Sequence, residues 1–306
     1  MMTLAAAGVL FSVQFLFTKQ YQLRAGAGWR PAIWMLVFAN LWMGFLFLSA
    51  GGFRLRILPA SLLYAVIYAV CAAVNNAASL FAMRLGKVAV VTLFSLSGGL
   101  LLPSAYGVIR LGEPLTAGKA AGTLLIVLAS FGCLFGKQDE RAAGSSRRRF
   151  WLLCFAVFVS NGMVSVVTKA HAIRADTGSS REFLTLTSLL GLIASAAILL
   201  PGLLKRTDEA GAAGLRARIG RDLGGKRAAW TLVLLTGGYA VCNGLANVCS
   251  MHTAKTMDSS LQFPLLSAMV VVFTALLAWA VFHEKPGRGD AAGLGLTVAG
   301  MALLVL

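Results

Sequence analysis

Seven of the amide side chains inside the long apolar runs of this 306-residue chain are candidates to contact a solute. A polar group in a bilayer is costly unless it is paired. Asn243 and Asn247 are four residues apart and share one helix face. The amides either line a cavity that binds a polar solute or join helices, at about 0.6 kcal/mol per contact. With two tyrosines that either line the cavity or pack between helices, the candidates are Asn75, Asn76, Asn243, Asn247, Gln14, Asn161, Gln262, Tyr68 and Tyr239.

Two lysines and two glutamates near the ends of apolar runs offer a second kind of chemistry. Lys19 and Lys169 either extend to the membrane surface or pair with carboxylates. If the two halves of the chain are inverted, Lys19 comes out beside Glu284. Lys169 then comes out beside Glu113, which also precedes an apolar run where a carboxylate favours a helix start. Each pair is a gate candidate for one face of the membrane.

The residues of hydrolytic or metal chemistry do not cluster. His171, His252 and His283 stand at the ends of apolar runs and form no metal-binding motif. None of the five cysteines forms a CxxC pair. We therefore predict no catalytic residues, no metal, no cofactor and no enzyme activity.

Composition explains why polar side chains stand out. The chain is 58% hydrophobic and only 12% charged, with a mean hydropathy of +0.80. Soluble domains are about 25% charged, so this chain lacks the polar surface that keeps a domain dispersed. The net charge of +16 comes from residues between the apolar runs, which favours membrane topology over nucleic-acid binding. Residues 1–18 hold no Lys or Arg, so we expect a retained first helix.

The apolar runs predict an all-α integral membrane protein, because a spanning helix needs about 20 apolar residues and lipid satisfies no backbone group. Pro103 and Pro264 lie inside two of the runs and predict kinks. A basic link at 138–149 separates five-helix units at 1–137 and 150–306, and the link 204–228 either forms a basic helix or is disordered. The ten predicted spans are 3–23, 31–50, 60–83, 87–110, 115–136, 150–170, 182–203, 229–252, 257–282 and 288–306.

An internal repeat relates the two units. The sequence Tyr-Ala-Val-Cys at 68–71 recurs at 239–242, a spacing of 171. The same spacing relates Asn76 to Asn247, Glu113 to Glu284, and the GxxxG motifs at 118–122 and 289–293, which predict close helix packing within the fold or between protomers. Near the start of each unit, Thr-Lys at 18–19 matches 168–169 at a spacing of 150. Two tandem five-helix units must be inverted relative to each other, as in many secondary transporters.

With its ten spans, and a glutamate before a glycine-rich run in each half, the chain resembles the EamA-type branch of the drug/metabolite transporter superfamily. These glutamates lie in Arg-Leu-Gly-Glu-Pro-Leu-Thr at 110–116 and Phe-His-Glu-Lys-Pro at 282–286. The second segment differs from the first because it has His-Glu-Lys-Pro in place of Gly-Glu-Pro. The resemblance implies a carrier with a central cavity and alternating access.

We therefore predict a secondary transporter for an amino acid-like or similar polar metabolite or a drug. The alternative is a membrane receptor or scaffold without transport. Its partners would be the small solute and the lipid bilayer, without nucleic acid, in a monomer or homodimer of a bacterial plasma membrane. Links after odd-numbered spans hold 19 of the 27 Lys and Arg residues. The positive-inside rule would then put both termini outside, whereas the resemblance implies the reverse, so the side stays open.

Overall fold

The computed structural model describes residues 1–306 except 27, 86–87, 133–145, 205–225, 284–287 and 306. The described residues form ten α-helices and no strands, which confirms the predicted all-helical class. The helices are α1 (Met2–Ala25), α2 (Trp29–Ser49), α3 (Pro59–Leu85), α4 (Val88–Leu111), α5 (Ala117–Gly132), α6 (Ser146–Ile173), α7 (Ser180–Leu204), α9 (Lys226–Ala254), α10 (Ser259–Phe282) and α11 (Arg288–Val305).

Eight of these helices are long and apolar enough to cross a bilayer, as in a multi-pass membrane protein. In α5 and α11 the apolar parts are shorter, at Ala117–Ala129 and Ala291–Val305. Many large apolar side chains on the outside of the bundle are exposed, including Leu41, Trp230 and Trp279. Apolar side chains on both the inside and the outside of a bundle indicate lipid as the surrounding solvent.

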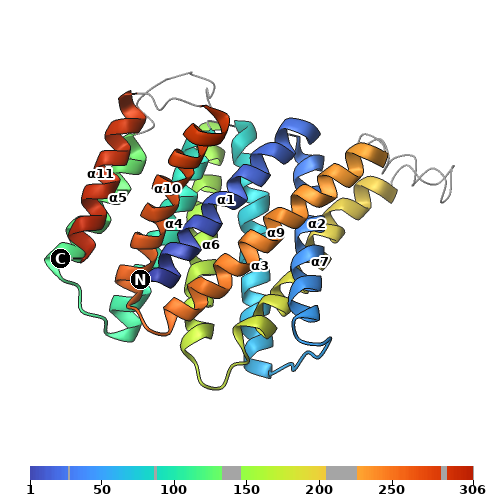
Figure 1. The fold of residues 1–306 in the computed structure, drawn as a ribbon, viewed down its shortest axis with the longest axis horizontal. Helices are drawn as coiled ribbons and strands as arrows, with labels where there is room; N and C mark the ends of the chain where they lie inside the picture. Colours follow the sequence, from blue (N-terminus) through green and yellow to red (C-terminus); the bar gives the residue numbers. More distant parts are fainter. Residues whose placement is uncertain (27, 86–87, 133–145, 205–225, 284–287, 306) are drawn as a thin grey trace.

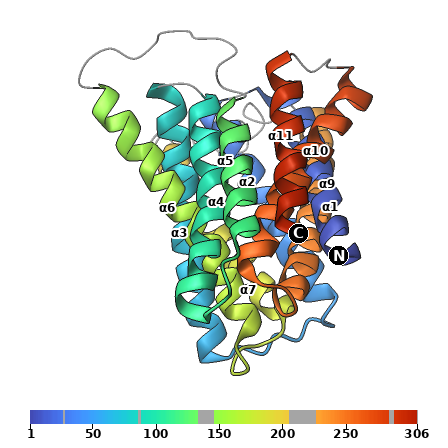
Figure 2. The ribbon, with the colours of Figure 1, turned by 90° about the vertical axis from the view of Figure 1, so that its left-hand side faces the viewer.

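Eight helices form a closed ring, in which each helix contacts the next in the order α1, α9, α2, α7, α3, α6, α4, α10 and again α1. The pair α5 and α11 packs together outside this ring, against α10 (Figure 1). Figure 2 shows this pair from its own side, with α4 and α6 beside it. The ring therefore surrounds a central space, and α5 and α11 take no part in it.

Close helix pairs in the ring depend on small residues. A Cβ atom on Gly98 of α4 would clash with the Phe158 carbonyl of α6, and one on Gly162 would lie 2.6 Å from the Gly98 carbonyl. Outside the ring, a Cβ on Gly122 of α5 would lie 2.7 Å from the Gly300 carbonyl of α11. Such positions let helix backbones approach closely in lipid. The second glycine of the predicted 118–122 motif thus packs within the fold.

Helix ends are fixed by local signals, and one predicted boundary moves. At the start of α7, the Ser179 amide donates to Glu182 and the Glu182 amide donates to the Ser179 hydroxyl, which is a capping box. Helix α6 begins at Ser146, so the last four residues of the predicted link 138–149 are helical. Most of the link 204–228 lies outside the described residues. Pro103 and Pro264 lie inside α4 and α10, as expected.

We call the end of the bundle with the connections 50–58, 112–116, 174–179 and 255–258 the lower end, as oriented in Figure 1. The opposite end, where α1 ends and α2 begins, is the upper end. Consecutive helices run in alternating directions between these ends (Figure 1).

Candidate functional site

A cavity of about 440 Å³ lies inside the ring. All eight ring helices contribute residues to its wall, so every ring helix borders the same space. Among the described residues that line it, none carries a formal charge. Its polar and aromatic lining consists of Phe11, Gln14, Phe15, Asn40, Tyr68, Asn75, Asn76, Asn161, Ser165, Thr168, Thr187, Ser188, Ser195, Tyr239, Asn243, Asn247, Ser250, Phe263 and Ser267.

Eight of the nine predicted cavity residues lie in this wall, and Gln262 does not. The Gln262 side chain is fully buried on α10, where its Nε2 donates to the Ser250 carbonyl of α9 at 2.8 Å. Gln262 therefore joins two helices, the second of the two roles that the sequence left open for intramembrane amides. Its neighbour Ser250 reaches the cavity instead.

Three of the predicted amides form a hydrogen-bonded chain across α1 and α9. Asn247 Nδ2 donates to both the backbone carbonyl and the side-chain Oδ1 of Asn243, at 2.8 and 3.0 Å. Asn243 Nδ2 in turn donates to Gln14 Oε1 at 2.6 Å. The Nε2 group of Gln14, which is nine-tenths buried, ends the chain. The spacing of four residues predicted the Asn243–Asn247 contact, whereas the link to Gln14 depends on helix packing.

Several residues of the cavity wall were not predicted from the sequence. Asn40 on α2 lines the cavity while its Nδ2 donates to the Leu36 carbonyl at 2.9 Å. On α7, the hydroxyls of Thr187 and Ser188 both donate to the Leu184 carbonyl. Serine and threonine satisfy their own donors in this way in any helix, so their sequence signal is weak. Asn40 was the one detectable omission, because it is an amide inside an apolar run.

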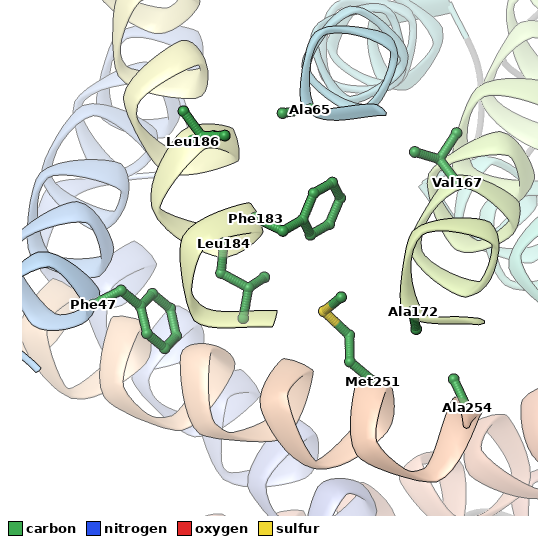
Figure 3. Close-up of a cluster of buried hydrophobic side chains, with 9 residues drawn as sticks. All are labelled: Phe47, Ala65, Val167, Ala172, Phe183, Leu184, Leu186, Met251 and Ala254. Carbon is green, nitrogen blue, oxygen red and sulfur yellow. The ribbon is translucent and has the colours of Figure 1, made fainter. Parts of the chain in front are cut away.

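The floor of the cavity is one buried apolar cluster at the lower end. Phe183 lies at its centre, between Ala65 of α3 and Met251 of α9 (Figure 3). Phe47 adds α2, and Val167, Ala172 and Ala254 complete the contact between α6 and α9. Met43 and Tyr68 both line the cavity and pack on this cluster. The cluster thus joins five ring helices directly below the cavity, and we call it the floor cluster.

A polar contact continues the floor toward the lower surface. His171 is buried, its ring stacks on Phe183 with 4.1 Å between centroids, and its Nε2 lies 3.1 Å from the Ser61 hydroxyl. The Ser61 hydroxyl also accepts from the Gly178 amide at 2.7 Å. One serine of α3 therefore holds both the end of α6 and the turn before α7.

Lys169 and Glu113 both form hydrogen bonds with the backbone at the connection between α9 and α10. The ammonium of Lys169, which is almost fully buried, donates to the carbonyls of Ala254 and Met257, both at 2.7 Å. Glu113 accepts from the amides of Ser259 and Ser260 at 2.7 and 2.9 Å. Of the two predicted gate pairs, this pair thus binds one backbone segment at successive residues, with no direct contact at ion-pair distance between the two side chains among the described residues.

Two further ion pairs lie at the lower end. Lys119 of α5 contacts Asp258, in the connection between α9 and α10, at 2.7 Å, with the Lys119 side chain mostly buried. Arg174 makes two contacts to Asp176 in the exposed turn after α6. The Arg174 hydrogen bonds hold the pKa of the Asp176 carboxyl below its usual value and raise the pKa of the guanidinium. The second predicted gate pair is not described, since Glu284 lies outside the described residues.

The upper end is built differently. Tyr21, Ile33, Trp34, Leu199 and Leu232 form one buried cluster among α1, α2, α7 and α9. Ala78, Ala82, Val91, Phe150, Cys154 and Val157 form another among α3, α4 and α6. No helix belongs to both clusters. Within the described chain, buried apolar packing therefore crosses the ring at the lower end and stays on two separate sides at the upper end.

Comparison with known proteins supports the fold and leaves the activity open. No family model and no curated protein sequence matches the chain. Among solved structures, 29 chains match. One of them is a crystal structure of a protein that is 19% identical, with a TM-score of 0.69 over 99% of this chain and 94% of the other. At this identity the likeness shows a shared fold alone.

Proposed function

We propose that this protein is a multi-pass membrane carrier that moves a small polar metabolite or a drug by alternating access. The observation that carries the proposal is the cavity of about 440 Å³, which all eight ring helices enclose and whose described lining combines apolar and uncharged polar residues. A pocket of this size suits a small ligand. Carriers commonly hold their solute near the middle of the membrane between two structural halves. The proposal includes kinship with the EamA-type branch, on the sequence features given above.

Two inverted five-helix halves are part of this proposal, with α1 to α5 equivalent to α6, α7, α9, α10 and α11. The helix contacts support this equivalence. The pairs α1·α9 and α6·α3 exchange when the halves are exchanged, as do α4·α6 and α10·α1 and also α3·α7 and α9·α2. The pairs α2·α7, α4·α10 and α5·α11 each join equivalent helices. A ring with this symmetry can close at either end through contacts between equivalent helices.

The described state, in this proposal, is closed at the lower end and open at the upper end. The floor cluster and the Lys169–Glu113 contacts support closure below the cavity. The two separate clusters support an opening above it. Transport then requires the two upper clusters to meet while the floor cluster separates. We expect exchange or facilitated diffusion, because no acid or base lines the described cavity to couple flux to protons.

The test is solute counterflow in proteoliposomes that hold the full chain, with a metabolite panel and with or without a pH gradient. We expect saturable exchange of at least one polar solute without the gradient, and none in protein-free liposomes. Flux that strictly depends on the gradient would contradict the uncoupled mechanism but would still support a carrier. Saturable binding without any flux would favour the alternative, a membrane receptor.

A further inference from the structure

The hydrogen-bonding state of the cavity wall carries information about the solute. Four of the amides already donate to the protein: Asn40 to Leu36, Asn161 to Ser95, Asn243 to Gln14, and Asn247 to Asn243. Five hydroxyls donate to carbonyls of their own helices: those of Ser165, Thr168, Thr187, Ser188 and Ser195. Each of these groups keeps oxygen lone pairs for another donor. These nine donor groups are therefore used within the protein, while their oxygen atoms can still accept a hydrogen bond from a solute.

Two acceptors in the wall stand out. The Oδ1 atom of Asn75 is buried and accepts no hydrogen bond from the described residues. A buried acceptor without a donor is costly. Gly99 also lines the cavity, and its carbonyl loses its regular helical donor because Pro103, four residues on, has no N–H. Asn75 and Gly99 come from neighbouring helices of the chain, α3 and α4. The Gly99 carbonyl thus lacks its regular helical donor, and a guest with an N–H or O–H group satisfies Asn75 once its amide turns Oδ1 toward the cavity.

The described cavity wall has no cationic side chain to balance an anion. A carboxylate or phosphate removed from water needs a cation or several committed donors. No described lining residue is cationic, and Lys169, the buried cation nearest the floor, uses its ammonium on the Ala254 and Met257 carbonyls. By contrast, the wall has aromatic side chains that can pack against an apolar ring or attract an ammonium group to the face of their own ring. They are Phe11, Phe15, Tyr68, Tyr239 and Phe263.

From these observations we infer that the carrier selects a solute with N–H or O–H donors, attached to an apolar or aromatic body, and rejects solutes with a carboxylate or phosphate. The inference rests on the proposed function and narrows its solute class to amides, amines or similar donors. Free amino acids fall outside this class, because their carboxylate would have no cationic partner in the described cavity.

Four compounds that share one indole ring separate these chemistries. Indole-3-acetamide is a neutral donor, tryptamine is a cationic donor, indole-3-acetate is an anion, and tryptophan is a zwitterion. Binding to the purified full chain in detergent is measured by ligand-dependent thermal melting at pH 7. We expect saturable stabilisation by indole-3-acetamide, by tryptamine or by both. Indole-3-acetate and tryptophan should bind about tenfold or more weakly. The first two compounds also distinguish a neutral from a cationic donor.

Three single substitutions test whether the compounds bind at the cavity wall. Asn75→Leu removes the orphan acceptor and should weaken binding of the preferred donor about threefold to tenfold. Gln22→Leu, which changes an exposed amide on α1 outside the cavity, should leave binding unchanged. Asn76→Lys adds a cation to the wall and should strengthen indole-3-acetate binding about tenfold.

Equal or tighter binding of indole-3-acetate or tryptophan to the unchanged protein would overturn the inference, as would no binding by any of the four compounds. These measurements need no transport, so they fail separately from the proposed function. Counterflow of an anionic solute would contradict the proposed selectivity but would still support a carrier. Binding of the donor compounds without counterflow of any solute would support the selectivity but contradict the carrier function.

Discussion

The two ends of the helix ring are built differently. At the lower end, the floor cluster joins five helices, and polar contacts of Ser61, His171, Lys169 and Glu113 lie around it. At the upper end, apolar clusters hold each side of the ring together without joining the sides. In the proposed state, a cavity between such ends is accessible from the upper side only. Polar contacts then accompany the closed end, where backbone segments must be held together across the ring.

The proposed repeat makes this comparison specific. At a spacing of 150, His171 and Phe183 of the lower end correspond to Tyr21 and Ile33 of the upper end. At a spacing of 171, Ser61 corresponds to Leu232. The polar His171–Ser61 contact thus stands where the upper end has an apolar Tyr21–Leu232 neighbourhood. Equivalent positions that differ in polarity give the two closures different energetics.

Glu113→Ala tests the polar contacts at the lower end, and we expect it to have the largest effect on stability. The change removes two charge-assisted hydrogen bonds and leaves the amides of Ser259 and Ser260 without their acceptor. We expect a loss of about 3 kcal/mol in stability, because each such bond contributes about 1.5–3 kcal/mol and Glu113 is only half-buried. Thermal melting in detergent measures the loss.

The matched control is Glu113→Gln, which keeps one side-chain oxygen as an acceptor and should lose about half as much. Accessibility of a cysteine at Ser250, in a chain without its native cysteines, reports opening of the floor to an impermeant maleimide from the lower side. If Glu113→Ala melts like the unchanged protein and keeps the floor closed, the connection between α9 and α10 does not depend on this carboxylate.

How much of this the sequence could predict differs between the cavity and its floor. Polar residues in apolar runs are conspicuous, so eight residues of the cavity wall could be found without a structure. The partners of Lys169 could not, because they are backbone carbonyls of a connection, which no residue type reveals. Gln262 shows the same limit, since the periodicity of α10 does not determine which neighbour each face meets. Helix composition predicts the elements, whereas the ring order comes from packing.

Ser61→Ala tests the polar contact itself. The Ser61 hydroxyl serves two partners, the His171 ring and the Gly178 amide, so its removal leaves both without a bond. We expect a loss of about 1–2 kcal/mol by thermal melting. Ser104→Ala is the matched control, because among the described residues the Ser104 hydroxyl bonds to the Leu100 carbonyl of its own helix. Equal effects of the two changes would show that the contact between α3 and α6 adds nothing to the closure.

Tyr21→Phe makes the corresponding change at the upper end. The Tyr21 hydroxyl makes one hydrogen bond, to the Pro31 carbonyl at 2.9 Å, while its ring packs in the apolar cluster. Phenylalanine keeps the ring, so we expect a loss of about 0.5–1 kcal/mol. The same melting assay compares it with Ser61→Ala. A larger loss at Tyr21 would reverse the proposed contrast, since polar contacts would then matter more at the apolar end.

Asp176→Asn should have the smallest effect and separates exposed from buried polar contacts at the lower end. The Arg174–Asp176 pair is exposed, so water and salt weaken it. Because Arg174 lowers the pKa of the Asp176 carboxyl in the folded protein, any stability from the pair is present above the unfolded pKa and disappears as pH falls through the lowered value. Between pH 5 and 8, melting of Asp176→Asn should therefore track the unchanged protein at a constant small offset that shrinks with added salt. An offset as large as that of Ser61→Ala would contradict the view that the buried contacts, and not the surface ion pair, close the lower end.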